Sequence, residues 1–409
     1  MDNARDIIAD SVSTAYCKAL DNKARREVLL SLFDFKNKTD QHHIKTLLGD
    51  KNLIVYGAGE GYIAFKNAVL DRYNITPLYV IDTKFEKEKV VNGIKCVSLR
   101  DLRITEEVKN SLIVVTIGDP KVYDEIYNLL HFTYAFDNII KSTDIFEFNI
   151  HHTHKKLESE EKFFYSYRKD TILKAFDSLA DDLSKEVFLS LMKIYMTHIP
   201  EVVPNRNKSE QYFPVDVHLS KGYDRFINCG AFDGDTIKQL VETIGRVDSL
   251  VCFEPDQNNY NLLVKYIQKD YIQERVFTGK RQHNVLCLPC GVYSDERSKT
   301  FISNNSLSSS ISSKGLSIIQ TVSLDNVLPT FNPTFINMDI EGAEYDALIG
   351  ARNMIKEYEP DLAISVYHYP EDLWNILIYI NSLGVNYKYY LRNYSGFTYE
   401  TILYCTVGD

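Results

Sequence analysis

The C-terminal end of the chain constrains the fold most. Residues 386–394 (NYKYYLRNY) and 400–407 (ETILYCTV) both read as strands, and the turn-like stretch SGFT lies between them. A parallel crossover needs about a dozen residues or more, so a connection this short forces an antiparallel hairpin. The chain therefore predicts a sheet whose last two strands form a reversed pair.

Five further strands precede this hairpin, and helical stretches separate them. They read RFINCG, SLVCFEP, VLCLPCGVYS, PTFINMDIEG and DLAISVYH. Strands that alternate with helices are joined by crossovers and make a parallel sheet. We therefore expect residues 215–409 to form an α/β domain with a parallel sheet and an antiparallel terminal hairpin.

A smaller α/β unit is expected before it. The stretch NLIVYGAGEGYIAFKNAVL changes from strand to glycine turn to helix, and PLYVID and SLIVVTIGD follow as strands. A strict dinucleotide fingerprint would place a third glycine where Tyr62 stands. We predict a Rossmann-like domain over residues 48–150, a helical segment before it (1–47) and a helical linker after it (151–214).

The charge and composition of the chain exclude several classes of partner. The 409 residues are 44% hydrophobic and 25% charged, as in folded soluble proteins, and the formal net charge is -10. An acidic surface has little attraction for nucleic acid or anionic membranes. No apolar run approaches the ~20 residues of a membrane span, and the start MDNARDIIAD has no signal-peptide pattern.

The cysteines and histidines predict neither disulfides nor a metal centre. The seven cysteines are scattered and odd in number, which suits reduced thiols in the cytoplasm. Cys287 and Cys290 form one C-x-x-C, but no second ligand pair with zinc-site spacing is evident, so a buried strand is the alternative. The HHTH cluster (His151, His152 and His154) is read as part of a solvated linker.

The stretch FINCGAFDGDT, residues 226–236, points to a bound nucleoside. Asn228, Gly230 and Gly234 fall at a strand end before a helix, where glycine allows a close backbone approach. Glu254 closes the next strand and can accept hydrogen bonds from two ribose hydroxyls. Strand, turn and acid together fit a methyl donor or NAD equally well, and a plain α/β turn is the structural alternative.

The order of motifs in this half resembles one known family. FINCGAFDGDT, CFEPDQNNYNLL, CGVYSDE, SSSIS, TVSLDNVL, FINMDIEGAEYDALIGA and ISVYHYPEDLW follow one another over roughly residues 225–407. Together they look like the FkbM family of S-adenosylmethionine-dependent methyltransferases. The predicted sheet with its reversed hairpin is likewise that of the class I methyltransferases. The motif DIEGAE, where it follows SLD, is the most specific part of this resemblance.

The resemblance implies roles for individual residues. It places the donor's ribose on Glu254, which Asp256 and Asn258 flank. The sequence departs from the family pattern at Asn228, where members often have an acid, and at Asn337, where they commonly have a lysine. The implied cofactor-binding residues are Asn228, Gly230, Ala231, Gly234, Glu254, Pro255, Gly291, Val292 and Asp339. The implied residues at the mouth of the site, on the substrate side, are Glu341 and Glu344.

Methyl transfer from a sulfonium needs positioning and, for a hydroxyl acceptor, removal of a proton. Asp339 and His368 end neighbouring strands and are the candidate catalytic groups. The alternatives are an N-cap for Asp339 and a turn cap for His368. Asp339, Glu341 and His368 could also ligate a divalent ion, although their spacing does not require one.

The first unit is similar to the nucleotide-sugar-binding domain found before some sugar acetyltransferases. Its candidate substrate-binding residues are Gly57, Gly59, Gly61 and Asp82; a packing or dimer module is the alternative. We expect a cytoplasmic methyltransferase that acts on a hydroxyl, or an amine, of a sugar-linked precursor in surface glycan biosynthesis. The rivals are a nucleotide-sugar oxidoreductase and a non-catalytic scaffold, and a homo-oligomer is left open.

Overall fold

The computed structural model divides into two compact units. It describes residues 22–34, 43–118, 120–145, 147–148, 164–197, 201–272, 284–302, 310–311 and 317–408. Unit 1 comprises the described parts of residues 1–35, 162–196 and 201–409, and unit 2 those of 36–161 and 197–200. The HHTH cluster at His151, His152 and His154 lies outside the described residues, as does most of the predicted N-terminal helical segment.

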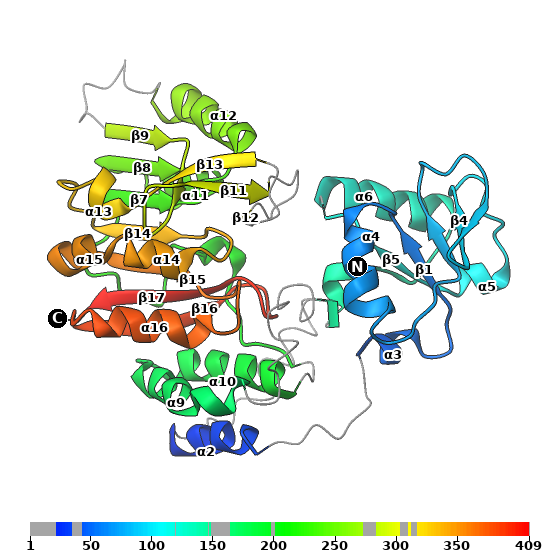
Figure 1. Cartoon of the computed structure of the whole chain (residues 1–409), viewed down its shortest axis with the longest axis horizontal. Coiled ribbons are helices and arrows are strands. Elements are labelled where there is room, and N and C mark those ends of the chain that lie inside the picture. Colours follow the sequence, from blue (N-terminus) through cyan, green and yellow to red (C-terminus); the bar gives the residue numbers. More distant parts are fainter. Residues whose placement is uncertain are drawn as a thin grey trace. The chain divides into compact units, whose positions relative to one another are not determined.

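Unit 1 contains a seven-stranded sheet in the order β16-β17-β15-β14-β7-β8-β9 (Figure 1). All neighbouring strands are parallel except at β17, which runs antiparallel to both β15 and β16. The predicted α/β fold with a reversed terminal hairpin is thereby confirmed. The strands are β7 (Arg225–Cys229), β8 (Ser249–Phe253), β9 (Asn284–Leu288), β14 (Phe335–Met338), β15 (Asp361–Ser365), β16 (Tyr387–Asn393) and β17 (Thr401–Val407).

Helices and short helical turns surround this sheet. The α-helices are α2 (Asn22–Leu32), α9 (Lys169–Ser178), α10 (Asp182–Thr197), α11 (Asp235–Thr243), α12 (Gln257–Tyr266), α13 (Leu324–Val327), α14 (Glu344–Ile349), α15 (Arg352–Tyr358) and α16 (Asp372–Ser382). The 3₁₀ and π turns are η4 (Ser166–Arg168), η5 (Lys208–Glu210) and η6 (Ile267–Tyr271).

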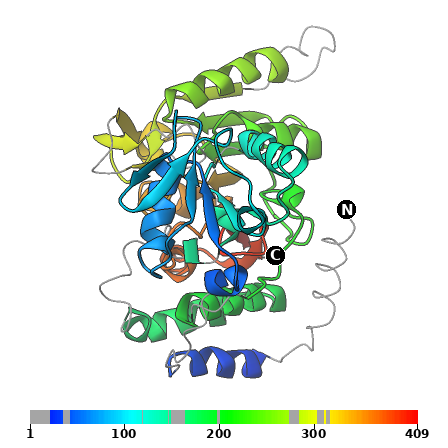
Figure 2. The same cartoon turned by 90° about the vertical axis from the view of Figure 1, so that its right-hand side faces the viewer.

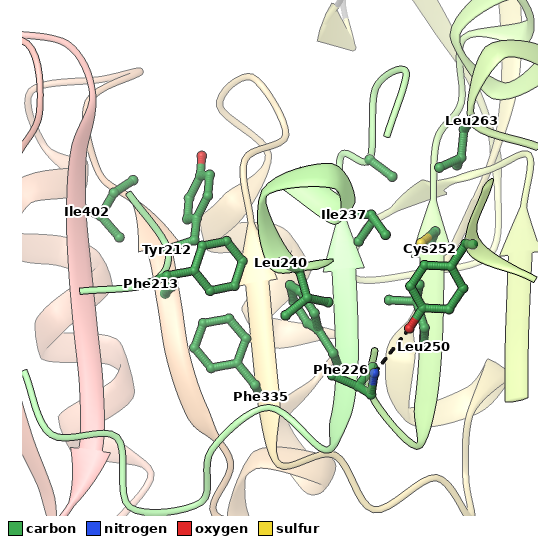
Figure 3. Packing of buried hydrophobic residues seen from close by; sticks show 14 of the residues in the cluster. Tyr212, Phe213, Phe226, Ile237, Leu240, Leu250, Cys252, Leu263, Phe335 and Ile402 are labelled. Carbon is green, nitrogen blue, oxygen red and sulfur yellow. Dashed lines mark hydrogen bonds between the residues drawn. The ribbon is translucent and has the colours of Figure 1, made fainter. Parts of the chain in front are cut away.

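The central strands are buried along their whole length, as expected for a parallel sheet covered on both faces. On one face Phe226 and Phe335 pack edge to face, with ring centroids 5.1 Å apart. Leu240 of α11 joins them in the same core cluster (Figure 3). Figure 3 also shows Tyr212 in this cluster, with its hydroxyl directed away from Phe213, toward the carboxyl ends of the strands.

Helices from the predicted linker pack on the sheet of unit 1 rather than apart from it. The guanidinium of Arg392 in β16 is 1% exposed and pairs with Asp181, just before α10, at 2.6 Å and with Asp216 at 2.9 Å. Arg25 of α2 pairs in turn with Asp182 of α10 at 2.8 Å. A buried guanidinium depends on such partners, so the sheet relies on a segment that lies well before it in the sequence.

A small second sheet interrupts the strand that the sequence predicted over VLCLPCGVYS. The chain leaves β9 at Leu288, and Gly291 begins a separate short strand. This sheet has the order β10-β13-β11-β12 and consists of β10 (Gly291–Val292), β11 (Ser298–Ile302), β12 (Ser310–Ile311) and β13 (Ser317–Val322).

Unit 2 is a six-stranded sheet in the order β3-β4-β2-β1-β5-β6, parallel except for the β3–β4 pair. The side chains of β1 alternate between two cores: Val55 packs with Phe65 on one face, and Ile54 packs with Ile126 on the other. Figure 2 shows the helices that carry these partners, α4 and α6, on opposite sides of the blue and cyan strands.

The elements of unit 2 are mostly short. The strands are β1 (Leu53–Tyr56), β2 (Tyr79–Ile81), β3 (Lys89–Val91), β4 (Ile94–Val97), β5 (Leu112–Val115) and β6 (Ile139–Lys141). The helices and helical turns are α3 (His43–Leu48), α4 (Glu60–Phe65), η1 (Lys66–Leu70), α5 (Glu106–Lys109), α6 (Pro120–Asn128), η2 (Leu129–Thr133) and η3 (Ser142–Asp144). In the described part of the chain, no helix combines the length and apolar character that crossing a membrane requires.

Candidate functional site

The candidate site lies at the carboxyl edge of the sheet in unit 1, where parallel α/β sheets bind ligands. Gly230, Glu254 and Asp339 each follow directly on the last residue of a strand, β7, β8 and β14 respectively. Because these strands are neighbours in the order β14-β7-β8, the glycine turn lies between the two carboxylates.

The glycine turn is held tightly between its neighbours. The N–H groups of Gly230 and Ala231 both donate to the carbonyl of Phe253, at 3.0 and 2.9 Å. Gly230 has a φ of +84°, and a Cβ added there would overlap the carbonyl oxygen of Asp339. Gly234 has a φ of +91°, and a Cβ there would lie 3.1 Å from the ring of Tyr266. Both glycines are therefore required by backbone conformation and close packing.

We expect Gly230→Ala to lower the unfolding free energy of unit 1 by about 2–4 kcal/mol, from left-handed strain plus steric overlap. Trp374, the one tryptophan of the chain, is fully buried in unit 1 and reports its unfolding by fluorescence in urea. Gly245→Ala is the matched control, because Gly245 is also left-handed (φ +103°) but a Cβ added there would have no atom within 4 Å. Equal losses in the two variants would contradict the overlap.

Glu254 is a nearly buried carboxylate, 6% exposed, at the end of β8. Its two oxygens accept the N–H groups of Phe232 and Asp256, each at 2.8 Å. Burial raises the pKa of Glu254 to about 7, against the effect of these two hydrogen bonds. The side chain of Asn259 is a third hydrogen-bonding neighbour of this carboxylate. An ionised carboxylate has about four acceptor positions, so it can take a further donor.

The flanking residues of Glu254 have structural roles. Asp256 caps α12: its Oδ1 accepts the N–H of Asn258 at 2.9 Å and that of Asn259 at 3.1 Å. A Cβ added to Gly291 would lie 4.0 Å from Cβ of Pro255, so β10 passes close to this segment. Val292 is 2% exposed and is buried beneath it.

Asn228 and Asn337 are direct cross-strand partners in β7 and β14. Both are buried, and the side-chain amide of Asn337 donates to Oδ1 of Asn228 at 3.2 Å. The remaining amide atoms, Nδ2 of Asn228 and Oδ1 of Asn337, have no hydrogen-bond partner among the described residues. Asn228 and Asn337 thus form one neutral, buried pair.

The mouth of the site holds four ionisable groups, here named the mouth cluster: Asp339, Glu341, Glu344 and His368. His368 Nδ1 lies 3.1 Å from Glu344 Oε1, and its Nε2 lies 3.5 Å from both Asp339 Oδ1 and Glu341 Oε2. Glu344 is fully buried and accepts the N–H of Ile340 at 2.7 Å. The predicted mouth residues are therefore brought together around one histidine.

The electrostatics of the mouth cluster follow from its burial. Burial alone would lower the pKa of His368, but the facing carboxylates, Glu344 foremost, raise it well above its usual value. Burial raises the pKa of Glu341 as well.

The structural alternatives for the two catalytic candidates, an N-cap for Asp339 and a turn cap for His368, do not appear. Helix α14 begins after Ala343, and the N–H of Tyr369 donates to Asp372 rather than to His368.

Two tyrosines that sequence reasoning missed hold Asp339 in place. Tyr212 donates to Asp339 Oδ2 at 2.6 Å, and Tyr367 donates to both oxygens at 3.2 Å. Burial, then the charge of Asp339, raises the pKa of both phenols well above 10, so they remain donors. Tyr367 precedes His368 in ISVYH, a local signal that could have identified it, whereas Tyr212 lies 127 positions before Asp339.

Backbone strain gathers at the same edge. Tyr212 (φ +68°), Phe232 (φ +47°) and Glu341 (φ +58°) adopt the left-handed conformation that non-glycine residues rarely take. Phe232 thereby directs its N–H at Glu254, and Glu341 turns the chain toward His368. Such conformations cluster at functional sites, where the surrounding structure maintains them.

The glycine turn of unit 2 is largely explained by its own packing. A Cβ added to Gly61 would overlap the carbonyl of Thr116, and one added to Gly57 (φ +101°) would come within 2.9 Å of the Thr116 hydroxyl. Asp82 accepts the N–H groups of Ala58 at 2.7 Å and Lys84 at 2.9 Å. Gly59 alone of the three glycines faces open space.

Cys287 lies on β9 and Cys290 just beyond it, and both are free thiols. Among the described residues, one group of His, Cys, Asp and Glu side chains is close enough to share a metal ion, namely Asp339, Glu344 and His368.

Comparison with known proteins identifies the domain that carries this site. Residues 228–391 match the methyltransferase FkbM domain. No curated protein matches the chain. The match spans the glycine turn, Glu254 and the mouth cluster, so the chain carries a methyltransferase domain and is a methyltransferase enzyme.

Solved structures support the fold. The chain resembles the crystal structure of methyltransferase FkbM from Methylobacillus flagellatus KT with a TM-score of 0.61 and 20% identity, over 94% of this chain and 100% of that one. At this identity the likeness shows the fold. Weaker matches include Aeropyrum pernix fibrillarin with bound S-adenosyl-L-methionine (TM-score 0.30, 10% identity, 46% of this chain and 70% of that one). An rRNA methylase from Streptococcus thermophilus matches with a TM-score of 0.30 and 11% identity, over 46% of this chain and 89% of that one.

Proposed function

We propose that the methyl donor of this enzyme is S-adenosyl-L-methionine, bound at the carboxyl edge of β7 and β8. The observation that carries the proposal is Glu254, a buried carboxylate that lies beside the glycine turn at the end of β8, where it can accept a hydrogen bond from a ribose hydroxyl. The proposed donor-binding residues are Asn228, Gly230, Ala231, Gly234, Glu254, Pro255, Gly291, Val292 and Asp339. Titration of the full chain with S-adenosylhomocysteine tests the proposal.

The acceptor atom is a hydroxyl oxygen, or an amine nitrogen, of a sugar or a sugar-linked precursor of a surface glycan. Its lone pair attacks the methyl carbon, the carbon–sulfur bond breaks, and the electron pair goes to sulfur, leaving S-adenosylhomocysteine. For a hydroxyl, a base must take the proton. Glu341 and Glu344 lie on the acceptor side of this site.

Asp339 is the better proton acceptor of the two catalytic candidates on geometric grounds. The side chain of His368 is only 10% exposed and both its ring nitrogens point at carboxylates, so the ring is poorly placed to meet an acceptor hydroxyl. Asp339 lies at the mouth, its side chain is 24% exposed, and its orientation is fixed by two tyrosine hydroxyls. His368 then acts as the charge partner that positions the carboxylates.

Unit 2 is proposed to recognise the acceptor's nucleotide or phosphate part. Gly57, Gly61 and Asp82 shape the turn, whereas Gly59 leaves its backbone open to a ligand. The net charge of -10 disfavours nucleic acid as the acceptor and fits a small or glycan substrate in the cytoplasm.

We expect Gly59→Val to raise the KM for the natural acceptor by about tenfold or more, because the branched side chain blocks hydrogen bonds from this backbone to a charged group. The S-adenosylhomocysteine affinity of unit 1 should not change. Steady-state rates at saturating donor and varied acceptor give the KM.

Gly59→Ala is the graded control for this prediction, since a methyl group fills less of the open space at Gly59. Its KM should lie between those of the wild type and Gly59→Val. Wild-type kinetics in both variants would make unit 2 a packing or assembly module instead.

A further inference from the structure

We propose that the mouth cluster holds a divalent transition-metal ion, with Asp339, Glu344 and His368 as its protein ligands. Only Asp339 is shared with the proposed donor-binding residues, so binding of the ion can be tested apart from donor binding, whereas its catalytic role below rests on the proposed function.

The geometry of these side chains suits a shared ion. One ligand atom from each of the three residues lies within 4.8 Å of the other two. Ligands of one ion at about 2.0–2.2 Å are at most ~4.4 Å apart, so a shift of a few tenths of an ångström completes the set. The side chains come from the ends of β14 and β15 and from the start of α14, which fixes their backbone positions.

Three atoms of Glu344 and His368 lack hydrogen-bond partners among the described residues. Oε2 of Glu344 is buried and unpartnered among the described residues, and so are both ring nitrogens of His368, whose side chain is only 10% exposed. Nδ1 of His368 and Oε1 of Glu344 approach to 3.1 Å without the angles of a hydrogen bond. Buried polar atoms are ordinarily satisfied, so this group calls for a missing partner.

The charge balance of the mouth cluster calls for a cation. Within the described residues, the ion pairs of Asp339, Glu341 and Glu344 are all with His368, and no lysine or arginine joins them. The one histidine cannot balance three carboxylates, and as a ligand of an ion it is neutral, so the ion itself must supply the positive charge; a buried uncompensated charge is costly. A divalent ion would supply positive charge and would also be a partner for the unpartnered atoms of Glu344 and His368.

The donor set selects the class of ion. Two carboxylates and one imidazole suit Mn²⁺, Fe²⁺ or Zn²⁺, whereas Mg²⁺ prefers oxygen ligands and keeps most of its water. Three protein ligands leave coordination positions open for water or an acceptor hydroxyl. An ion there would lower the pKa of the bound hydroxyl, whose proton then leaves to a nearby carboxylate such as Glu341, or to water, before the oxygen attacks the methyl carbon.

The test titrates Mn²⁺ into the EDTA-treated full chain and follows free Mn²⁺ by its electron paramagnetic resonance signal. We expect saturable binding of one ion per chain. Glu344→Gln should weaken this binding by about 100-fold or more, since even the loss of an outer partner costs 10–100-fold. The absence of saturable binding up to about 1 mM Mn²⁺ would overturn the proposal.

Glu341→Gln is the matched control, because it removes the same charge from the same mouth but lies outside the three-ligand set. It should weaken Mn²⁺ binding by less than about fivefold, through long-range attraction alone. Equal losses in Glu341→Gln and Glu344→Gln would mean diffuse attraction of cations and would overturn the site. If Glu344→Gln fails to fold by Trp374 fluorescence, His368→Gln carries the same expectation.

Failure of this inference can be told apart from failure of the donor site. S-adenosylhomocysteine titrated in EDTA should bind to wild type and to Glu344→Gln alike, because Glu344 is a ligand of the ion but is not among the proposed donor-binding residues. Donor binding without Mn²⁺ binding would remove only the metal site. Mn²⁺ binding without donor binding would remove only the proposed donor.

Discussion

Asp339→Asn is expected to lower the methyl-transfer rate by roughly 10²–10⁴-fold and to change the affinity for S-adenosylhomocysteine far less, because asparagine can keep a polar contact with the donor. Asparagine keeps the size of the side chain and an oxygen that can accept from Tyr212 and Tyr367. It loses the negative charge that accepts a proton or holds a cation. Single-turnover rates at saturating donor and acceptor measure the effect on the chemical step.

Tyr367→Phe is the control for Asp339→Asn, because it removes one hydrogen bond to the carboxylate and keeps the carboxylate itself. The rate of this variant should fall by about tenfold at most. That factor corresponds to the lower end of the free energy of one hydrogen bond to a charged group. Full turnover in Asp339→Asn would mean that positioning alone drives the reaction and would remove Asp339 from the catalytic residues.

Glu254→Ala is expected to weaken S-adenosylhomocysteine binding by about 10- to 100-fold, because it leaves two ribose hydroxyls without a charged acceptor, a loss of about 1.5–3 kcal/mol.

The affinity of the wild type for S-adenosylhomocysteine should also fall as the pH drops from 8 to 6. The pKa of Glu254 is raised to about 7 in the free protein, so the carboxylate that accepts the hydroxyls is progressively lost below that pH.

Asp256→Asn is the matched control for Glu254→Ala. It removes a carboxylate two positions away, and asparagine still caps α12, so donor affinity should change by less than about threefold. If Asp256→Asn and Glu254→Ala weakened binding equally, general charge at this edge rather than a specific ribose contact would account for the affinity.

The same ionisation of Glu254 bears on stability. Its folded pKa of about 7 lies above the ordinary value of 4.5, so its contribution is fully present below pH 4.5 and is lost as the pH rises through 7. Donor binding, which favours the ionised form, should recover that loss. The ionised form of Glu254 is therefore more favourable when the donor is bound than in the free protein.

The main sheet could be predicted from the sequence because its signals are local. The short link between β16 and β17 permits one arrangement, and each parallel strand carries its own apolar run. The β3–β4 hairpin was missed although Asn92 (φ +51°) and Gly93 (φ +81°) form the Asn-Gly turn typical of hairpins. The small sheet from β10 to β13 pairs strands that no local pattern connects.

The candidate site was predictable only in part. The acidic residues of DIEGAE stand out in the sequence, but Tyr212 reaches Asp339 from a segment before β7, which only the folded chain brings near. Asn228 and Asn337 illustrate the same point. The sequence gives no sign that these two residues meet, but in the fold they are cross-strand partners that share a hydrogen bond and bury no charge.

Glycine turns show a further limit of sequence reasoning. Gly57, Gly59 and Gly61 are indistinguishable by type, yet two of them are required by contact with Thr116 and one faces open space. A glycine can be required either by a bound ligand or by a neighbouring segment of the chain. Which of the two applies depends on the distance from the glycine to other segments in the fold, and the spacing of glycines along the sequence does not give that distance.

A methyl donor is proposed to bind beside Glu254 in unit 1. Calorimetric titration of S-adenosylhomocysteine into the full wild-type chain and into Glu254→Ala at pH 8, with NAD as the competing ligand, tests it most directly. We predict one S-adenosylhomocysteine per chain, an affinity lower by about 10- to 100-fold in Glu254→Ala, and no comparable binding of NAD. Unchanged affinity in a folded Glu254→Ala, or NAD in place of S-adenosylhomocysteine, would contradict the account.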